Sequence, residues 1–197
     1  MKTRNNVLII AEAGVNHNGD INVAFDLINA AAEAGADIIK FQTFNPDSIV
    51  TSYSRKADYQ KSNELGRDEN QLAMLKRLRL NSSEQNLLVN KCNSLGIEFL
   101  STGFDLESLD FLEKLDMKRY KIPSGEITNL PYLRRISKFK KPIIMSTGMA
   151  SLFEIKASLD VLYECGCTQK DITLLQCTSE YPAPIDEINL SAMKSFK

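Results

Sequence analysis

The sequence predicts an α/β protein whose parallel strands form part of a (β/α)₈ barrel, and two observations support this fold class. Short apolar runs rich in β-branched residues alternate with longer stretches in which apolar residues recur every three or four positions. Such alternation is typical of βαβ units and therefore of a parallel sheet. Polar residues also follow the apolar runs, where the catalytic rim of a barrel enzyme lies.

Six strands are expected from the apolar runs. The first is the run 7–10, which precedes a polar turn at 16–20. The predicted strands cover residues 7–10, 37–42, 97–101, 119–122, 142–145 and 172–176.

Helices are expected between these strands. After the first strand, Val23, Leu27, Ile28 and Ala31 fall on one helix face. An aspartate before this helix and a glycine after it, Asp20 and Gly35, supply an N-cap and a stop. The other predicted helices cover residues 83–95, which Gly96 ends, 106–115, 131–139 and 152–165.

One connection is much longer than the others. Sixty residues separate the strand ends at Gln42 and Thr102, which implies an insertion over 44–80. The insertion is polar and has an amphipathic stretch around Leu72, Leu75 and Leu78. Long loops in compact domains are usually functional or mobile, so we interpret the insertion as a lid over the site.

A doubly wound sheet is the main alternative, and it would normally carry a glycine-rich phosphate motif after its first strand. Gly14 and Gly19 match neither that motif nor a P-loop. The barrel is therefore preferred. Six units do not close an eight-stranded barrel, and such barrels typically need about 250 residues. We therefore expect residues 1–197 to be the N-terminal part of a barrel, truncated after about six βα units.

Composition excludes several classes of protein. The net charge of -1 argues against binding nucleic acid through charge alone. No apolar run is long enough for a signal peptide or a membrane span, so we expect a cytoplasmic protein without membrane contact. The four cysteines are expected to be reduced thiols. A zinc site at Cys165 and Cys167 lacks further ligands, because His17 is the only histidine and lies far away in sequence.

The second strand ends in Lys40, Phe41 and Gln42. Side chains alternate along a strand, so Lys40 and Gln42 share the face toward the barrel mouth and Phe41 packs outward. A lysine beside an amide suits a phosphate or a carboxylate. The alternative is a lysine that reaches out to solvent.

The fourth strand has Lys121 near its end and is followed by Ser124 and Glu126. The lysine could hold a substrate anion, and the serine could donate to a phosphate oxygen. The glutamate could act as an acid or a base if its pKa is raised. The alternative for the serine and glutamate is a turn with a solvated carboxylate.

The third and fifth strands end alike, as Ser-Thr-Gly at 101–103 and 146–148. Hydroxyls and glycine amides before a helix can cradle an anion, because free N–H groups and the helix dipole point at it. The alternative is that these hydroxyls only cap the helices. Two copies beside two lysines favour a phosphate site.

The first and sixth strands add further candidates. Glu12 directly follows an apolar strand, which is costly unless it has a partner or a site to serve. Thr178 and Tyr181 follow the sixth strand. His17 is interpreted as a loop-stabilising residue, and a Ser-His-Asp triad is not expected because no serine lies in a nucleophile elbow.

Five segments together resemble the sialic acid synthase family, whose members make neuraminic and legionaminic acids. The match covers nearly the whole chain in order and is carried by residues 11–19, 40–44, 120–126, 144–149 and 177–182. The resemblance implies a (β/α)₈ barrel enzyme, a transferase that condenses phosphoenolpyruvate with an N-acetylated mannose-type sugar. The products are phosphate and a nine-carbon nonulosonic acid.

The resemblance also implies roles for individual residues. Phosphoenolpyruvate would be held by Lys40, Gln42, Thr102, Lys121, Ser124 and Ser146. Glu12 and Tyr181 would contact the sugar, Thr178 would add to substrate binding, and Glu126 would handle the proton or position the water. We take Glu126, Glu12 and Lys121 as the catalytic set.

Family members use a divalent metal as a Lewis acid, usually manganese, with magnesium or cobalt as alternatives. Its histidine ligands lie on later strands, so they are expected beyond residue 197 and no metal ligand is assigned here. The resemblance further implies a C-terminal antifreeze-like (SAF) domain, absent from this chain, and a homodimer. Many members have a proline at Gly103 and an asparagine at Ser179, and these departures concern a sugar or anion contact.

Two other functions remain open at this stage. A Schiff-base aldolase would use Lys40 or Lys121 as an uncharged amine. Alternatively, the chain is an inactive truncated fragment, with open strand edges that favour aggregation. Within the synthase reading, the segment 56–60 does not decide between N-acetylmannosamine and 2,4-diacetamido-2,4,6-trideoxymannose.

Overall fold

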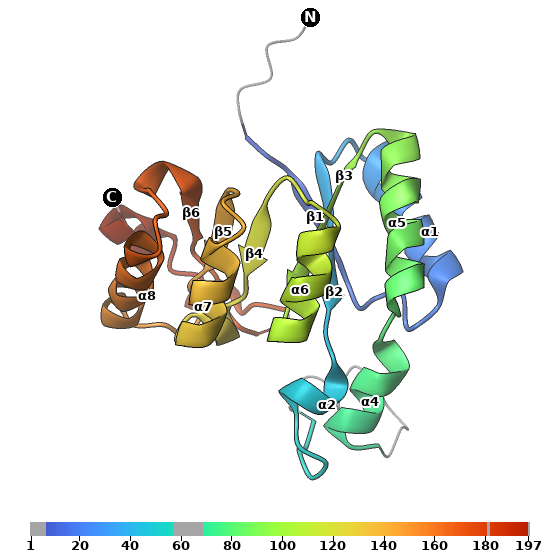
Figure 1. The fold of residues 1–197 in the computed structure, drawn as a ribbon, viewed down its shortest axis with the longest axis horizontal. Helices are drawn as coiled ribbons and strands as arrows, with labels where there is room; N and C mark the ends of the chain where they lie inside the picture. The colour runs from blue at the N-terminus through green and yellow to red at the C-terminus, as the bar shows by residue number, and fades with distance from the viewer. Residues whose placement is uncertain (1–6, 57–68, 181, 197) are drawn as a thin grey trace, which may run out of the picture.

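The computed structural model describes residues 7–56, 69–180 and 182–196. Its six strands form one parallel sheet in which each strand pairs with the next along the chain. The sheet is curled, with helices between successive strands, and β1 and β6 are its two edges (Figure 1). This arrangement confirms the predicted fold class, an open part of a (β/α) barrel.

Five of the six strands lie where the sequence predicts them. The strands are β1 (Ile10–Gly14), β2 (Ile38–Thr43), β3 (Glu98–Gly103), β4 (Tyr120–Ile122), β5 (Ile143–Ser146) and β6 (Ile172–Leu175). The prediction of the first strand at 7–10 is wrong, because pairing with β2 begins at Ile10 and continues to Gly14. The apolar residues Val7, Leu8 and Ile9 precede the paired segment and are exposed.

The predicted helices are also present. They are α1 (Ile21–Glu33), α5 (Ser82–Leu95), α6 (Leu106–Lys114), α7 (Leu130–Ser137) and α8 (Leu152–Glu164). The Asp20 side chain accepts a hydrogen bond from the Asn22 backbone at 2.8 Å and so caps α1. Gly96 ends α5 with a φ of 70°, a left-handed conformation that glycine adopts without strain.

The main core lies between the sheet and the helices. Phe41 of β2 and Leu88 of α5 are almost fully buried there, and so are Leu109 of α6 and Leu133 of α7. The prediction that Phe41 packs outward is therefore confirmed. Burial of these large side chains holds each helix against the strands on either side of it. The polar strand residues that alternate with the buried ones, such as Lys40 and Gln42 on either side of Phe41, face the opposite side of the sheet.

The insertion after β2 contains two helices, α2 (Pro46–Ile49) and α4 (Gln71–Leu78). The predicted amphipathic stretch is confirmed as α4, although Met74 and Leu78 are its buried residues rather than Leu72. Met74 and Leu78 pack with Phe44 in a small second core. Figure 1 places α2 and α4 beyond the carboxyl ends of the strands. The lid interpretation stays a prediction, and residues 57–68 of the insertion lie outside the described part.

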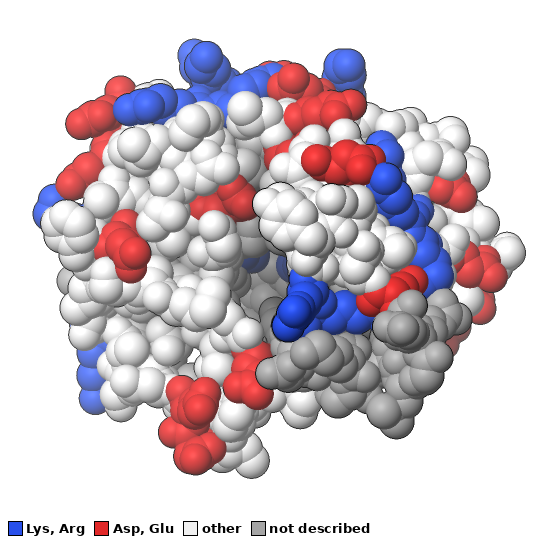
Figure 2. All heavy atoms as spheres, turned by 90° about the horizontal axis from the view of Figure 1, so that it is seen from below, with Lys and Arg blue, Asp and Glu red and all other residues white. Residues whose placement is uncertain are grey.

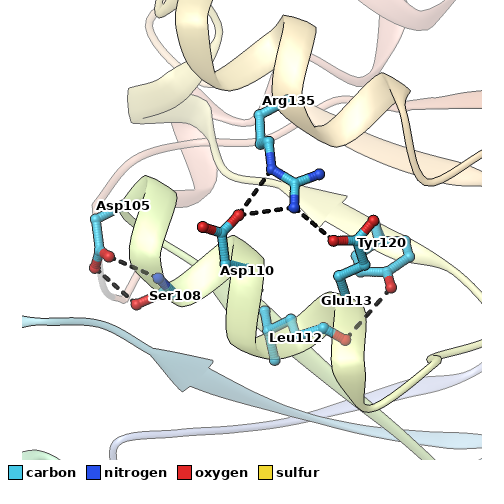
Figure 3. A network of polar contacts seen from close by, with 7 residues as sticks. All are labelled: Asp105, Ser108, Asp110, Leu112, Glu113, Tyr120 and Arg135. Carbon is cyan, nitrogen blue, oxygen red and sulfur yellow. Dashed lines mark hydrogen bonds and ion pairs between the residues drawn. The ribbon is translucent and has the colours of Figure 1, made fainter.

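The outer helices are joined by polar contacts as well as by the core (Figure 3). Arg135 of α7 donates to Asp110 of α6 at 2.7 Å and to Glu113 of α6 at 2.5 Å. The Arg135 guanidinium also lies 4.7 Å from the ring centre of Phe139. These contacts fix α7 against α6 on the outside of the sheet.

None of the helices in the described residues combines the length and the apolar character that crossing a membrane requires.

Candidate functional site

Polar side chains line the inner face of the sheet near the carboxyl ends of the strands. The register pairs Glu12 with Lys40, Gln42 with Thr102, and Thr102 with Lys121. Paired residues on neighbouring parallel strands point to the same face, so these five side chains lie next to one another. Figure 2 views this end of the molecule and shows a hollow near its centre, with basic atoms visible in its depth.

Lys40 forms an ion pair with Glu12 on the neighbouring strand. The Lys40 side chain is 15% exposed and that of Glu12 is 44% exposed. The lysine therefore stays on the inner face, and the alternative in which it reaches out to solvent is wrong. This pair also explains how a glutamate is accommodated inside β1, because its charge has a partner.

Lys121 is the most deeply buried charged group of the site, at 7% exposure. Its ammonium donates to the Ile122 carbonyl at 2.7 Å and to Ser146 Oγ at 2.6 Å. Burial, and to a smaller extent repulsion from Lys40, lowers the pKa of Lys121 to about 8, although Cys177 and Glu12 act in the opposite direction. A bound anion would relieve both unfavourable effects, because it neutralises the charge that burial and Lys40 oppose.

Three hydroxyl groups lie beside these lysines. Ser146 Oγ accepts hydrogen bonds from Lys121 and from the Cys177 thiol, the latter at 3.3 Å. Ser124 Oγ accepts a hydrogen bond from the Gly148 backbone at 3.0 Å. Thr102 Oγ1 is buried and has no hydrogen-bond partner among the described residues. A hydroxyl that only accepts, or has no partner, keeps its own proton for a ligand.

The two Ser-Thr-Gly segments turn out not to be equivalent. In the first, Thr102 faces inward and Ser101 faces the helices, where it contacts Thr43 at 2.7 Å. In the second, Ser146 faces inward and Thr147 donates to the Leu175 carbonyl at 2.9 Å. The two copies therefore contribute different residues to the site.

The alternative role of these hydroxyls, as helix caps, is wrong. Asp105 caps α6 by accepting from the Ser108 backbone at 2.8 Å. Ser151 caps α8 by accepting from the Glu154 backbone at 3.3 Å. The two caps lie two and three residues after the Ser-Thr-Gly segments.

Glu126 lies in a short 3-10 turn, η1 (Ser124–Glu126), directly after β4. It is partly exposed and accepts a hydrogen bond from the Asn129 side chain at 2.6 Å. This contact orients the carboxylate, and the catalytic role of Glu126 stays a prediction. Thr178 lies after β6 and is partly buried. Tyr181, the predicted sugar contact, lies outside the described residues.

His17 is 1% exposed and packs near Phe41, with 6.2 Å between the ring centres. Its Nδ1 accepts a hydrogen bond from the Gly19 backbone at 3.0 Å. Burial lowers its pKa, while Glu84 acts to raise it. The interpretation of His17 as a loop-stabilising residue is confirmed.

Gly103 and Ser179, the two positions that depart from the family pattern, lie in different parts of the structure. A Cβ at Gly103 would lie 3.0 Å from Leu109 and 3.3 Å from Leu112, so this position faces α6 and not the site. Ser179 is different, because its Oγ would lie 2.4 Å from a Cβ at Gly148. The change at Ser179 therefore concerns the site itself.

Two residues to which the sequence analysis gave no individual role belong to the site, Cys177 and Gly148, the latter expected only as part of the segment 146–148. A Cβ at Gly148 would lie 2.9 Å from Ser124 Oγ and close to Ser179, so only glycine fits between these hydroxyls. Their positions in the sequence could have indicated a place in the site, since Gly148 lies two residues after the inward Ser146 and Cys177 follows the last strand.

The described residues do not fit a divalent metal. No group of three or more His, Cys, Asp and Glu side chains comes together among them in a way that could hold an ion. We therefore assign no metal ligand and no chemical step through a metal to these residues.

Comparisons with known proteins identify the family. The model of the NeuB family matches residues 27–197. The chain is 53% identical to N,N'-diacetyllegionaminic acid synthase of Campylobacter jejuni, over 96% of this chain and 57% of that protein. It is 50% identical to the enzyme of the same name from Legionella pneumophila, over 95% of this chain and 53% of that protein. The chain thus spans a little over half the length of these relatives.

A solved structure agrees with these sequence relationships. The N-acetylneuraminic acid synthetase of Leptospira borgpetersenii superposes with a TM-score of 0.81 at 30% identity, covering 96% of this chain and 60% of that one. The curled parallel sheet, the inward lysines and hydroxyls and these similarities lead to one conclusion: the chain belongs to the NeuB family.

Proposed function

We propose that the protein, in its full-length form, is a transferase that condenses phosphoenolpyruvate with an N-acetylated mannose-type sugar to give a nonulosonic acid and phosphate. The observation that carries the proposal is the pair of inward lysines, Lys40 and Lys121, beside inward hydroxyls at one end of the sheet. This arrangement, in a chain that belongs to the NeuB family, suits a substrate with both a phosphate and a carboxylate.

The anion site would act mainly by binding and orientation. Within the described residues, two of the three N–H groups of Lys121 are engaged by Ile122 and Ser146, so the third is left for an anion. Thr102 and Ser146 would donate their hydroxyl protons to the same anion. Ordered donors in a partly buried site hold phosphoenolpyruvate in one orientation and lower the entropic barrier to attack.

The proposed reaction forms one carbon–carbon bond and breaks one carbon–oxygen bond. The enol carbon of phosphoenolpyruvate attacks the aldehyde carbon of the open-chain sugar, whose oxygen takes up a proton. Water then adds at C2, and the tetrahedral intermediate loses phosphate by C–O cleavage. Glu126, oriented by Asn129, would move the proton or position the water, and Glu12 would contact the sugar. Thr178 and Tyr181 would complete the substrate contacts.

For the sugar, we propose 2,4-diacetamido-2,4,6-trideoxymannose rather than N-acetylmannosamine. Identity is 53% and 50% to two N,N'-diacetyllegionaminic acid synthases. It is 34% to a pseudaminic acid synthase of Campylobacter jejuni and 31% to the N-acetylneuraminate-9-phosphate synthase of Mus musculus. This gradient supports a legionaminic acid product.

Three further expectations remain part of the proposal. The enzyme would use a divalent metal, manganese or alternatively magnesium or cobalt, with ligands beyond residue 197. It would act as a homodimer and in the cytoplasm. The aldolase alternative is not favoured, because the named relatives at 50–53% identity are synthases.

The test is release of inorganic phosphate from phosphoenolpyruvate by the full-length gene product with manganese, comparing the two sugars. We expect faster release with the diacetamido sugar. Equal rates would contradict the proposed sugar, and no release with either would contradict the reaction. Borohydride trapping with pyruvate then tests the aldolase directly, since only a Schiff base gives a covalent adduct.

A further inference from the structure

Ser146 occupies a central place in the anion site because two donors converge on its hydroxyl oxygen. The Lys121 ammonium donates to Ser146 Oγ at 2.6 Å, and the Cys177 thiol donates to the same oxygen at 3.3 Å. The three residues come from β4, from the end of β5 and from the segment after β6. Ser146 is buried at 8% exposure.

The two contacts determine what Ser146 can do with its own proton. A serine hydroxyl has two acceptor lone pairs and one O–H donor. Lys121 and Cys177 together occupy both lone pairs, so the remaining function of this hydroxyl is to donate. Without the thiol, one lone pair would be open, and the hydroxyl could rotate and turn its proton elsewhere.

A second observation, on the neighbouring strand β3, also points to an anion on this inner face. Thr102 is 2% exposed, and its Oγ1 has no hydrogen-bond partner among the described residues. Thr102 pairs directly with Lys121 across β3 and β4, so its hydroxyl faces the same space. A buried hydroxyl without a partner is costly, and an anion that accepts from it removes this cost.

Ser124 shows a related arrangement with a single donor. Its Oγ accepts from the Gly148 backbone at 3.0 Å, so it too is supplied with a donor from a neighbouring segment. In one case the donor is a backbone amide and in the other a side-chain thiol. The Cys177 thiol can be removed by a conservative side-chain substitution, whereas the backbone amide of Gly148 cannot.

We propose that Cys177 is a positioning residue of the anion site: its thiol, together with Lys121, restricts the Ser146 hydroxyl to donating to a bound anion. The identity of that anion as phosphoenolpyruvate rests on the function proposed above. Cys177 does not react with the substrate in this proposal.

The first experiment compares Cys177→Ala and Cys177→Ser in the full-length protein, with Cys165→Ala as the matched control at an exposed cysteine. Equilibrium binding of phosphoenolpyruvate is measured without sugar, and KM and kcat are measured with it. Cys177→Ala is expected to raise Kd and KM for phosphoenolpyruvate about three- to tenfold, the range of one hydrogen bond, with kcat changed less than about twofold.

Cys177→Ser is expected to restore phosphoenolpyruvate affinity to within about twofold of wild type, because a hydroxyl can donate the same hydrogen bond. Cys165→Ala should leave Kd and KM unchanged. Equal Kd values for wild type and Cys177→Ala would overturn the proposal. So would a serine variant as weak as the alanine variant, because a loss of packing alone would then explain the effect.

The second experiment uses the wild-type protein and needs no variant to fold. Iodoacetamide labelling of Cys177 and Cys165 is followed by peptide mass spectrometry, with phosphoenolpyruvate or inorganic phosphate present or absent. Either anion should slow labelling of partly buried Cys177 at least about threefold and leave Cys165 unaffected. Equal labelling rates of Cys177 with and without saturating phosphoenolpyruvate would overturn the proposal.

These readouts separate the two proposals. Protection of Cys177 together with no phosphate release from phosphoenolpyruvate in the presence of either sugar would contradict the synthase function but support the positioning role. Phosphate release with unchanged affinity in Cys177→Ala would do the reverse.

Discussion

Thr102 and Lys121 lie directly opposite each other on β3 and β4, so a buried hydroxyl without a described partner faces the same space as a buried ammonium group. Each is unfavourable in the free protein, the hydroxyl because it lacks a hydrogen bond and the ammonium because it is desolvated. Both costs are removed when an anion binds between them. This relationship leads to the first two predictions.

Thr102→Val should weaken phosphoenolpyruvate binding without destabilising the protein. Valine has nearly the shape of threonine, and the lost hydroxyl makes no hydrogen bond within the described residues. We expect an unfolding free energy equal to or about 1 kcal/mol above wild type and a Kd for phosphoenolpyruvate raised about tenfold. Urea unfolding and equilibrium binding measure the two effects.

Thr43→Val is the matched control for that substitution. Thr43 Oγ1 is bonded to Gln85 at 2.6 Å and to Ser101 at 2.7 Å on the outer side of the same strands. This variant should lose about 1–3 kcal/mol of stability and keep its affinity for the anion. If Thr102→Val destabilised the protein as much as Thr43→Val, Thr102 would have a structural role.

Lys121 should set an alkaline limit for substrate binding. Its pKa is lowered to about 8, so the ammonium loses its charge in the free protein as the pH rises through that value. We expect kcat/KM for phosphoenolpyruvate to fall above about pH 8. Lys40→Met should move this limit to higher pH, because it removes the repulsion that helps to lower the Lys121 pKa. A limit that stayed in place in Lys40→Met would assign it to another group.

The same pKa has an opposite consequence for stability. Between about 8 and the ordinary value of 10.5, the unfolded chain binds more protons at Lys121 than the folded chain does. The contribution of Lys121 to the unfolding free energy therefore rises with pH across this window. Lys121→Met should flatten that part of the stability profile, measured by urea unfolding from pH 7 to 10. An unchanged slope would contradict the lowered pKa.

Gly148→Ala should disturb the hydroxyls at the rim. Its Cβ would lie 2.4 Å from Ser179 Oγ and 2.9 Å from Ser124 Oγ, closer than side chains tolerate. We expect phosphoenolpyruvate affinity to fall about tenfold or more, because Ser124 must move away from its place in the site. The double variant Gly148→Ala/Ser179→Ala removes the closest contact and should recover part of the loss.

Gly125→Ala is the control for the effect of adding a methyl group near the site. No described heavy atom lies within 4 Å of a Cβ at that position, so the affinity should be unchanged. Failure of the double variant to recover any affinity would indicate that the contact with Ser179 is not the cause.

Arg135 should contribute to stability and not to substrate binding. It joins α6 and α7 through Asp110 and Glu113 on the outside of the sheet (Figure 3). Its guanidinium also lies over the Phe139 ring. Arg135→Gln should cost about 1 kcal/mol, less at high salt because the carboxylates are partly exposed. Urea unfolding at two salt concentrations checks this. Lys156→Gln, which breaks an exposed pair with Asp160, should cost less.

Much of the fold followed from local sequence patterns. The strands at 37–42 and 142–145 and the helices at 83–95 and 106–115 were predicted nearly in place, because apolar periodicity and caps act within a few residues. The wrong prediction of the first strand, at 7–10, also came from a local apolar pattern. The apolar run 7–9 suggests a strand by itself, but strand assignment depends on pairing, and β2 pairs only from Ile10 onward.

The candidate site was partly predictable for a similar reason. Alternation along a strand places Lys40 and Gln42 on one face, and strand ends of parallel strands share one edge of the sheet. What the local pattern lacks is the register between strands. The two Ser-Thr-Gly segments look identical in sequence, yet Thr102 faces inward in one and Ser146 in the other.

The sequence by itself therefore determined the alternation of strands and helices, the inner face of the second strand and the residue types available at the rim. Only the tertiary structure decided which of them meet: Lys121 with Ser146, Cys177 with Ser146, and Gly148 with Ser124. Periodicity and capping are local properties of the chain, whereas these contacts join residues more than twenty positions apart. Their geometry depends on the register and curl of the whole sheet, which no single segment encodes.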